Sequence, residues 1–184
     1  MQLKTVVFLG AKKIGYDCLH HLISQQGDLH FQLTAVLGSP AKRSGVVQDV
    51  QALALSAGIP VLNHLDEVPP CDFLISVQYH EILRASHLKQ AKELAVNLHM
   101  APLPEYRGCN QFTMAILEDR SLFGATLHCM DEGVDHGDIL FEKRFPLKKG
   151  IWVDELYNET EQVSFFLFRE SLPAMLEGAY TPIP

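Results

Sequence analysis

The stretch from Asn97 to Asp138, NLHMAPLPEYRGCNQFTMAILEDRSLFGATLHCMDEGVDHGD, is the one around which the chain is organised. It follows a short apolar run that is typical of a buried β-strand. Asn97 and His99 are separated by one residue, so an extended strand presents both side chains on the same face. The stretch ends in an acidic, glycine-containing loop, residues 130–138, from which Asp135 can reach back toward the imidazole. An amide, an imidazole and a carboxylate together favour acyl-transfer chemistry.

The order of motifs in this stretch resembles the catalytic core of the 10-formyltetrahydrofolate-dependent formyltransferases. That family's pattern is Asn-x-His, a Leu-Pro turn, Arg/Lys-Gly, an apolar helix, Gly-x-Thr and Val/Leu-Asp-x-Gly. The matching residues here are Asn97 and His99, Leu103-Pro104, Arg107-Gly108, Gly124-Ala125-Thr126 and Val134-Asp135-His136-Gly137. The sequence that follows His99 is most similar to that of the sugar-nucleotide N-formyltransferases, a branch related to the methionyl-tRNA and glycinamide ribonucleotide formyltransferases. The resemblance also suggests a cis bond between Leu103 and Pro104.

Length and charge narrow the class of protein. The 184 residues are expected to form a single domain, residues 1–184, with a substantial core. A hydrophobic share of 47% and a charged share of 20% are typical of an ordinary globular protein. The net charge of -7, without a clustered Lys/Arg face, disfavours a nucleic-acid partner. A tRNA acceptor is disfavoured accordingly, and tRNA formyltransferases add a further domain after the catalytic one, whereas this sequence ends at Pro184.

The four cysteines show no CxxC pairing, and the first residues lack a signal-peptide pattern. No apolar stretch approaches the roughly 20 residues that span a bilayer. We therefore expect free thiols, a cytoplasmic protein and no membrane partner.

Short apolar runs alternate with helical patterns along the chain. This alternation predicts an α/β fold of the Rossmann-like, doubly wound type, with a mostly parallel sheet and ligands at the carboxyl ends of its strands. Expected strands are residues 4–10, 31–39, 59–62, 72–77, the run that delivers Asn97, 123–130 and 138–147, the last two forming an antiparallel pair. The first expected helix starts near residue 14, and further helices are expected at residues 46–57, 81–92, 111–117 and 154–178. The core residues expected on the last helix are Phe165, Phe166, Leu167, Leu172 and Met175. A loop at residues 40–45 is interpreted as mobile or facing a ligand.

The resemblance implies a role for each of the three central residues. His99 would handle the proton, because an imidazole with a pKa of about 6.5 is largely neutral at working pH. Asp135 would orient that ring and stabilise its charged form, and the amide N–H of Asn97 would stabilise the oxyanion. Taken singly, His99 is more simply a buried histidine whose hydrogen bonds are satisfied, Asp135 a solvated loop charge and Asn97 a turn residue. Their shared spacing favours the catalytic interpretation.

Further residues are candidates for binding. We expect the folate to contact two groups of residues: Tyr79, Ile82 and Leu83 after the strand 72–77, and Asp131, Gly133 and Val134 in the acidic loop. We expect the acceptor to contact Lys12, Arg107, Gly108 and Gln111. The alternatives are core packing for Ile82 and Leu83, a turn former for Asp131, a plain strand-to-helix turn at Lys12, a surface salt bridge for Arg107 and a helix-surface position for Gln111.

Two further histidines, His128 and His136, invite a metal interpretation together with His99 and Asp135. No compact ligand motif such as HExxH occurs, and the expected reaction needs no metal. We therefore expect no metal. Cys109 is expected to be a small packing residue rather than a nucleophile.

The sequence thus predicts an N-formyltransferase that moves a formyl group from 10-formyltetrahydrofolate to a primary amine of a small molecule, a nucleotide-linked amino sugar in the first instance. Three alternatives stay open: a glycinamide-ribonucleotide-type acceptor, a formyltetrahydrofolate deformylase with water as acceptor, and a non-catalytic folate- or nucleotide-binding relic. Sugar-nucleotide formyltransferases commonly extend further at the C-terminus to complete a dimer interface or acceptor site. A homodimer and the identity of the amine are therefore open as well.

Overall fold

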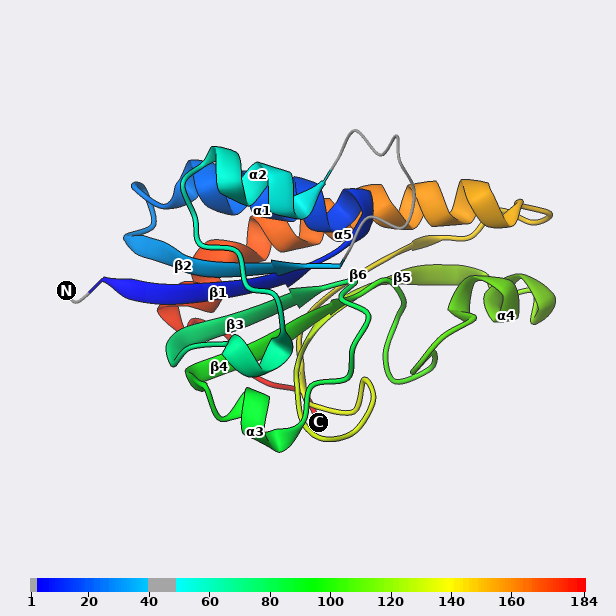
Figure 1. Cartoon of the computed structure of the whole chain (residues 1–184). Coiled ribbons are helices and arrows are strands. Elements are labelled where there is room, and N and C mark those ends of the chain that lie inside the picture. The colour runs from blue at the N-terminus through cyan, green and yellow to red at the C-terminus, as the bar shows by residue number, and fades with distance from the viewer. Residues whose placement is uncertain (1–2, 40–48) are drawn as a thin grey trace. The chain divides into compact units, whose positions relative to one another are not determined.

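The structure is a computed structural model that describes residues 3–39 and 49–184 (Figure 1). The chain divides into two compact units, Met1–Val96 and Asn97–Pro184. The expectation of one catalytic domain stays a prediction. The loop expected at residues 40–45, and the expected start of the second helix at Val46, lie outside the described residues.

The first unit is built on three parallel strands. They are β1 (Lys4–Gly10), β2 (Phe31–Gly38) and β3 (Cys71–Val77), and β1 pairs with both of the others. The middle of β1, Val6–Leu9, is fully buried, as expected for a parallel strand that is covered on both faces. The helices α1 (Lys12–Gln25) and α2 (Val50–Ser56) pack against each other and lie on the same side of these strands (Figure 1). The carboxyl ends of the three strands therefore lie at one edge of this unit.

The last part of the first unit departs from the sequence-based expectation. The helix expected at residues 81–92 is wrong: α3 covers only Ala85–Leu88, after the short 3-10 turn η1 (Leu65–Glu67). The side chain of His87 holds the start of α3 by accepting a hydrogen bond from the Arg84 N–H at 3.1 Å, while its Nε2 pairs with Asp66 at 2.9 Å. The strand expected at residues 59–62 is reduced to an isolated bridge between Val61 and Val36.

The strand β4 (Ala91–His99) runs through the boundary of the units and ends on the pair Asn97 and His99. In the second unit, β5 (Leu122–Cys129) and β6 (Ile139–Pro146) pair antiparallel, which confirms the predicted antiparallel pair. The strand order is β2-β1-β3-β4-β5-β6. The predicted mostly parallel α/β sheet with an antiparallel C-terminal pair is thereby confirmed.

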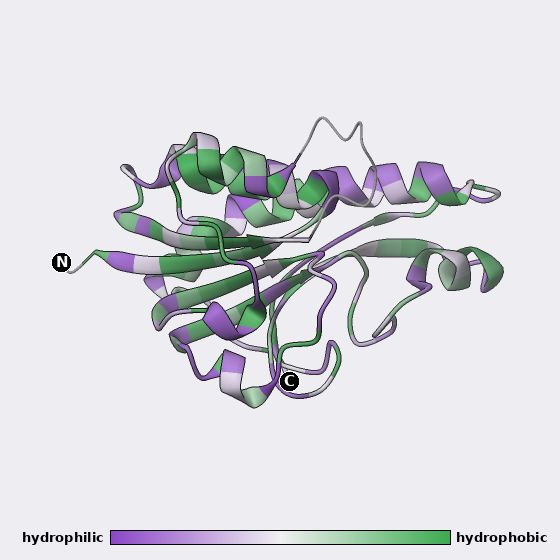
Figure 2. Ribbon diagram, in the orientation of Figure 1, coloured by the Kyte–Doolittle hydropathy of each residue, from purple (hydrophilic) through white to green (hydrophobic). Residues whose placement is uncertain are grey.

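Helices α4 (Gln111–Leu117) and α5 (Val153–Glu177) have the bounds that the sequence predicted to within a residue. Along α5, apolar and polar residues alternate at helical spacing (Figure 2), and its predicted core residues Leu167, Leu172 and Met175 are buried. The core assignment of Phe166 is wrong, because its side chain is 41% exposed and lies beneath the cations of Lys143 and Arg169.

The core of the second unit is an aromatic cluster centred on the fully buried Phe123, which contacts the rings of Tyr106, Phe112 and Phe145. Tyr106 thereby ties the segment after β4 to the sheet. Within residues 3–39 and 49–184, no helix combines the length and the apolar character that crossing a bilayer requires.

Candidate active site

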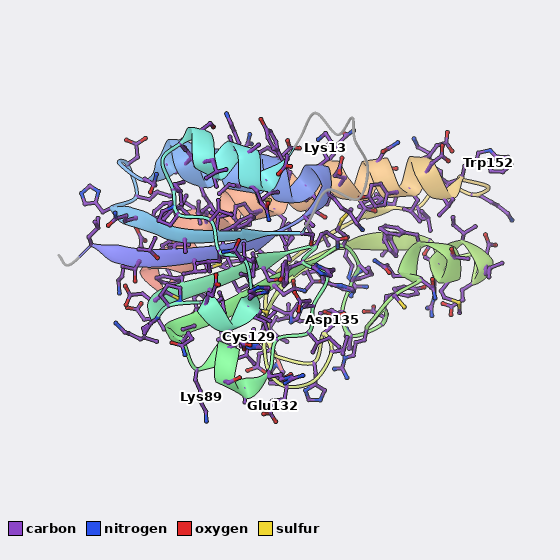
Figure 3. The ribbon with its side chains drawn as sticks, viewed as in Figure 1. Lys13, Lys89, Cys129, Glu132, Asp135 and Trp152 are labelled. Atoms are coloured by element: carbon purple, nitrogen blue, oxygen red, sulfur yellow. The ribbon has the colours of Figure 1, made fainter. Side chains whose placement is uncertain are left out.

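The second unit brings Asn97, His99 and Asp135 together. Asn97 and His99 lie at the carboxyl end of β4, whereas Asp135 comes from the loop between β5 and β6. The amide Nδ2 of Asn97 lies 3.4 Å from Oδ1 of Asp135, and Nδ1 of His99 lies 3.4 Å from Oδ2 of the same carboxylate. Figure 3 shows Asp135 further inward than Glu132, which lies at the outer edge of the loop. The carboxylate therefore faces both other side chains.

The backbone at Asp135 adopts a left-handed conformation, with φ at 49°. This region is costly for most side chains, and Asp and Asn tolerate it better than others. The turn places the carboxylate among protein groups, so that its side chain is only 12% exposed. Gly108 fixes it further, because its backbone N–H donates to Oδ2 at 2.9 Å.

The ring of His99 is held in one orientation by a backbone carbonyl. Its Nε2 lies 2.6 Å from the carbonyl oxygen of Tyr106, and since a carbonyl only accepts, this nitrogen carries the proton. In the neutral ring, Nδ1 is then the basic nitrogen, and it is the atom that faces Asp135. A proton that arrives at Nδ1 creates an imidazolium directly beside the carboxylate.

His128 belongs to the same network. Its Nδ1 lies 2.8 Å from the carbonyl oxygen of Cys129 and must donate there, so in the neutral ring Nε2 accepts the N–H of Asn97 at 3.1 Å. The same Nε2 lies 3.3 Å from Asp135 Oδ1. Sequence reasoning considered His128 only as a metal ligand. The position of His128 in an apolar strand could have indicated its role, because a buried polar side chain needs a hydrogen-bond partner.

The environment shifts the pKa values of the acid and the base. Burial lowers the pKa of His99 below its usual value, and this outweighs the opposing effects of the Asp135 charge and of the Tyr106 carbonyl. Burial raises the pKa of Asp135, but the hydrogen bond that His128 Nε2 donates when it carries a proton, the charge of His99 and the Gly108 N–H outweigh it, so the pKa is below its usual value. At neutral pH the site therefore holds a neutral imidazole beside a carboxylate.

We expect the imidazole of His99 to titrate below its usual pKa of about 6.5. Because the charge of Asp135 raises this pKa, replacing Asp135 by Asn should lower the midpoint further. Following the ring nitrogens by NMR from pH 4 to 8 measures both effects. An unchanged midpoint in the Asp135→Asn variant would contradict the assigned pairing.

The other candidate residues in the second unit differ in their contacts and in their exposure. Gly108 contacts Asp135, whereas Arg107 is exposed and Gln111 is half-buried at the start of α4. Asp131 closes its own loop, because it accepts from the Gly133 N–H at 2.8 Å and pairs with His136 at 2.9 Å. This agrees with the interpretation of Asp131 as a turn former. Val134 is 53% exposed.

The remaining candidates, Lys12, Tyr79, Ile82 and Leu83, belong to the first unit and follow the carboxyl ends of β1 and β3. Lys12 Nζ donates to Gln78 Oε1 at 2.8 Å, and both residues have positive φ, 61° and 53°. Strained backbone of this kind clusters at functional sites. Tyr79 donates to Glu81 at 2.6 Å, and Leu83 is buried. Ile82 is 71% exposed, which excludes the core-packing alternative for it.

Among the described residues, no group of three or more His, Cys, Asp and Glu side chains is arranged to hold a metal ion. All four cysteines are free thiols, as predicted, and Cys109 is exposed. The Leu103–Pro104 bond is cis, as the resemblance suggested. Asn110 occupies the N-cap position of α4 but makes no capping hydrogen bond through its side chain.

The family model for formyl transferases matches residues 60–170, which include the end of β4, the loop of Asp135 and most of α5. The chain belongs to the formyl transferase family. Among curated relatives, methionyl-tRNA formyltransferase of Limosilactobacillus fermentum is 28% identical over 98% of this chain and 61% of the relative. The enzyme of Lactobacillus gasseri is 30% identical over 99% of this chain and 62% of the relative. The chain thus spans less than two thirds of the length of these relatives.

Solved structures of formyltransferases share the fold of this family member. An N-formyltransferase from Helicobacter canadensis, in complex with folinic acid and dTDP-3-aminofucose, has a TM-score of 0.82 at 21% identity, covering 99% of this chain and 67% of that one. Glycinamide ribonucleotide transformylase 1 from Symbiobacterium toebii has a TM-score of 0.79 at 17% identity, covering 99% and 95%. At these identities the likeness establishes the fold.

Proposed function

We propose that this protein is an N-formyltransferase that transfers the formyl group of 10-formyltetrahydrofolate to a primary amine of a small molecule, specifically a nucleotide-linked amino sugar. The observation that carries the proposal is the meeting of Asn97, His99 and Asp135 in a chain of the formyl transferase family. We further place the reaction in the cytoplasm, which the free thiols support.

In the proposed reaction, the unprotonated amine attacks the formyl carbon. A new C–N bond forms, the carbonyl oxygen becomes an oxyanion, and the bond from the carbon to the folate N10 then breaks. Nδ1 of His99 takes the proton that the amine loses, and this proton is returned to N10 as it leaves. Asp135 favours the step because its charge lies 3.4 Å from the nitrogen that becomes positive.

The amide of Asn97 supplies a donor for the oxyanion. One of its N–H groups is taken by His128 at 3.1 Å, and the other makes a long bond of 3.4 Å to Asp135. The long bond is the weaker one and is exchanged for the oxyanion as negative charge develops. His128 keeps the amide in place during this exchange, because its own Nδ1 stays fixed on the Cys129 carbonyl.

Two loops suit the apolar ring system of a folate. Ile82, in the loop after β3, and Val134, beside Asp135, expose 71% and 53% of their surface, although both are apolar. Sites for small molecules are lined predominantly by apolar and aromatic side chains. We propose that both, with Tyr79 and Leu83, contact the folate, and that Lys12, Arg107 and Gln111 contact the acceptor.

Charge supports a small acceptor over tRNA. Residues 97–184 carry 14 Asp and Glu against 7 Lys and Arg, and residues 1–96 carry 8 of each, so the whole net charge of -7 lies in the second unit. Neutralisation of phosphates supplies most of the affinity for a nucleic acid, and an acidic surface opposes it. The names of the curated relatives make methionyl-tRNA the second candidate acceptor.

A panel of acceptors tests the proposal. Purified protein is given 10-formyltetrahydrofolate with dTDP-linked amino sugars, glycinamide ribonucleotide or methionyl-tRNA, and the release of tetrahydrofolate is followed optically together with the product mass. We expect release and a formyl mass gain on an amino-sugar nucleotide. A mass gain on methionyl-tRNA alone would replace the small acceptor by tRNA. Release of tetrahydrofolate without any acceptor would indicate a deformylase. No release with any of the acceptors would contradict the proposed transferase activity.

A further inference from the structure

The segment Leu103–Gly108 carries the backbone groups that set both His99 and Asp135. The carbonyl of Tyr106 receives the Nε2 proton of His99 at 2.6 Å, and the N–H of Gly108 donates to Asp135 at 2.9 Å. A small shift of this segment therefore changes the hydrogen bonds of His99 and of Asp135 at the same time.

Arg144, on β6, holds the same segment. Its Nη1 and Nη2 donate to the two carboxylate oxygens of Glu105 at 2.6 and 3.0 Å, and Nη2 also lies 3.4 Å from the carbonyl oxygen of Leu103. A second carboxylate, Glu142, lies 2.9 Å from Nη2. The planar guanidinium thus binds the segment through a bidentate pair and one backbone carbonyl, a geometry that a lysine cannot reproduce.

The energy of this ion pair alone would not distinguish it from a surface salt bridge. Its side chains are 33% and 35% exposed, and exposed pairs contribute little to stability. The difference lies in what the pair connects. The pair of Arg169 with Glu170 joins adjacent residues of α5, whereas Arg144 joins β6 to the backbone beside the catalytic pair. A misplacement of about 1 Å can reduce catalysis about 100-fold, even when the substitution lies away from the reacting groups.

We propose that Arg144 is a positioning residue for formyl transfer: by holding Glu105 and the Leu103 carbonyl, it keeps the Tyr106 carbonyl against His99 and the Gly108 N–H against Asp135. The inference rests on the proposed function. Tyr106 anchors the segment on its other side, through its hydroxyl bond to Glu118 at 2.9 Å and its contact with Phe123. Arg144 therefore fixes where the segment sits on the sheet rather than whether it folds.

The test compares Arg144→Gln, Arg144→Lys and Glu105→Gln with Arg169→Gln as a matched control on α5. We expect kcat to fall about 10-fold or more in Arg144→Gln and Glu105→Gln, with Tm close to that of the wild type, and by an intermediate factor in Arg144→Lys. Arg169→Gln should keep the wild-type rate. The imidazole titration of His99, followed by NMR, should move to lower pH in Arg144→Gln, because its bond to the Tyr106 carbonyl loosens.

A wild-type rate and an unmoved His99 titration in Arg144→Gln would overturn the inference, as would equal rate losses in Arg144→Gln and Arg169→Gln. The NMR titration requires no turnover. If the wild type transfers no formyl group to any acceptor, the proposed function fails, while the titration still shows whether Arg144 sets the environment of His99.

Discussion

Replacing His99 by Ala is expected to lower kcat/KM for formyl transfer by about 10²- to 10⁴-fold, the range that a positioned acid or base contributes. The reason is that Nδ1 of His99 is the basic nitrogen beside Asp135, whereas His128 points its basic nitrogen at the Asn97 amide. Binding of the folate should persist. Steady-state kinetics with the best acceptor, and a folate titration followed by fluorescence, measure the two effects separately.

The Ala variant also leaves the Tyr106 carbonyl without its donor, at a cost of about 1 to 3 kcal/mol. A second variant, His99→Gln, keeps an N–H for that carbonyl but has no basic nitrogen. It should lose activity to the same extent with a smaller fall in Tm. The exposed His20 on α1, replaced by Ala, serves as the control and should keep full activity. Turnover that survives in both His99 variants would refute its role as the base.

The sequence was sufficient for elements whose pattern is local. The buried strands β1 and β3 and the helices α4 and α5 follow from apolar runs and helical spacing that a short window contains. The helix expected at residues 81–92 is wrong at both ends, because α3 begins after Arg84, whose N–H donates to His87, and β4 already begins at Ala91. His87 also pairs with Asp66, 21 residues earlier, a contact that no short window of sequence contains.

The candidate site, too, was predicted only in part from the sequence. The spacing of Asn97, His99 and Asp135 predicted that the three side chains meet, and their contacts agree with it. The partners that set the chemistry are backbone groups and a second histidine: the Tyr106 carbonyl, the Gly108 N–H and His128. A backbone group carries no sequence signature. Nothing in the residue types therefore indicates which nitrogen of His99 holds the proton.

The isosteric change Asp135→Asn is expected to lower kcat by up to about 10⁴-fold, the loss that follows the same change in an unrelated Ser-His-Asp triad. The carboxylate makes two kinds of contact that an amide cannot make together. Oδ2 accepts from Gly108 and faces Nδ1 of His99, while Oδ1 faces the amide of Asn97 and Nε2 of His128. An Asn that keeps its oxygen on Gly108 turns its NH₂ toward Asn97 and His128, where it competes with the Asn97 donor.

Charge is the second loss in Asp135→Asn. The imidazolium that forms at His99 during the reaction loses its counter-ion, which lies 3.4 Å away inside a buried site, where water screens the interaction poorly. We therefore expect kcat to fall more than KM rises, because the missing interaction develops only as the proton moves. Asp138→Asn, an exposed change in the same loop, is the matched control. Equal activities of Asp135→Asn and Asp138→Asn would show that the carboxylate merely shapes the loop, and the proton would then have to be stabilised by another group.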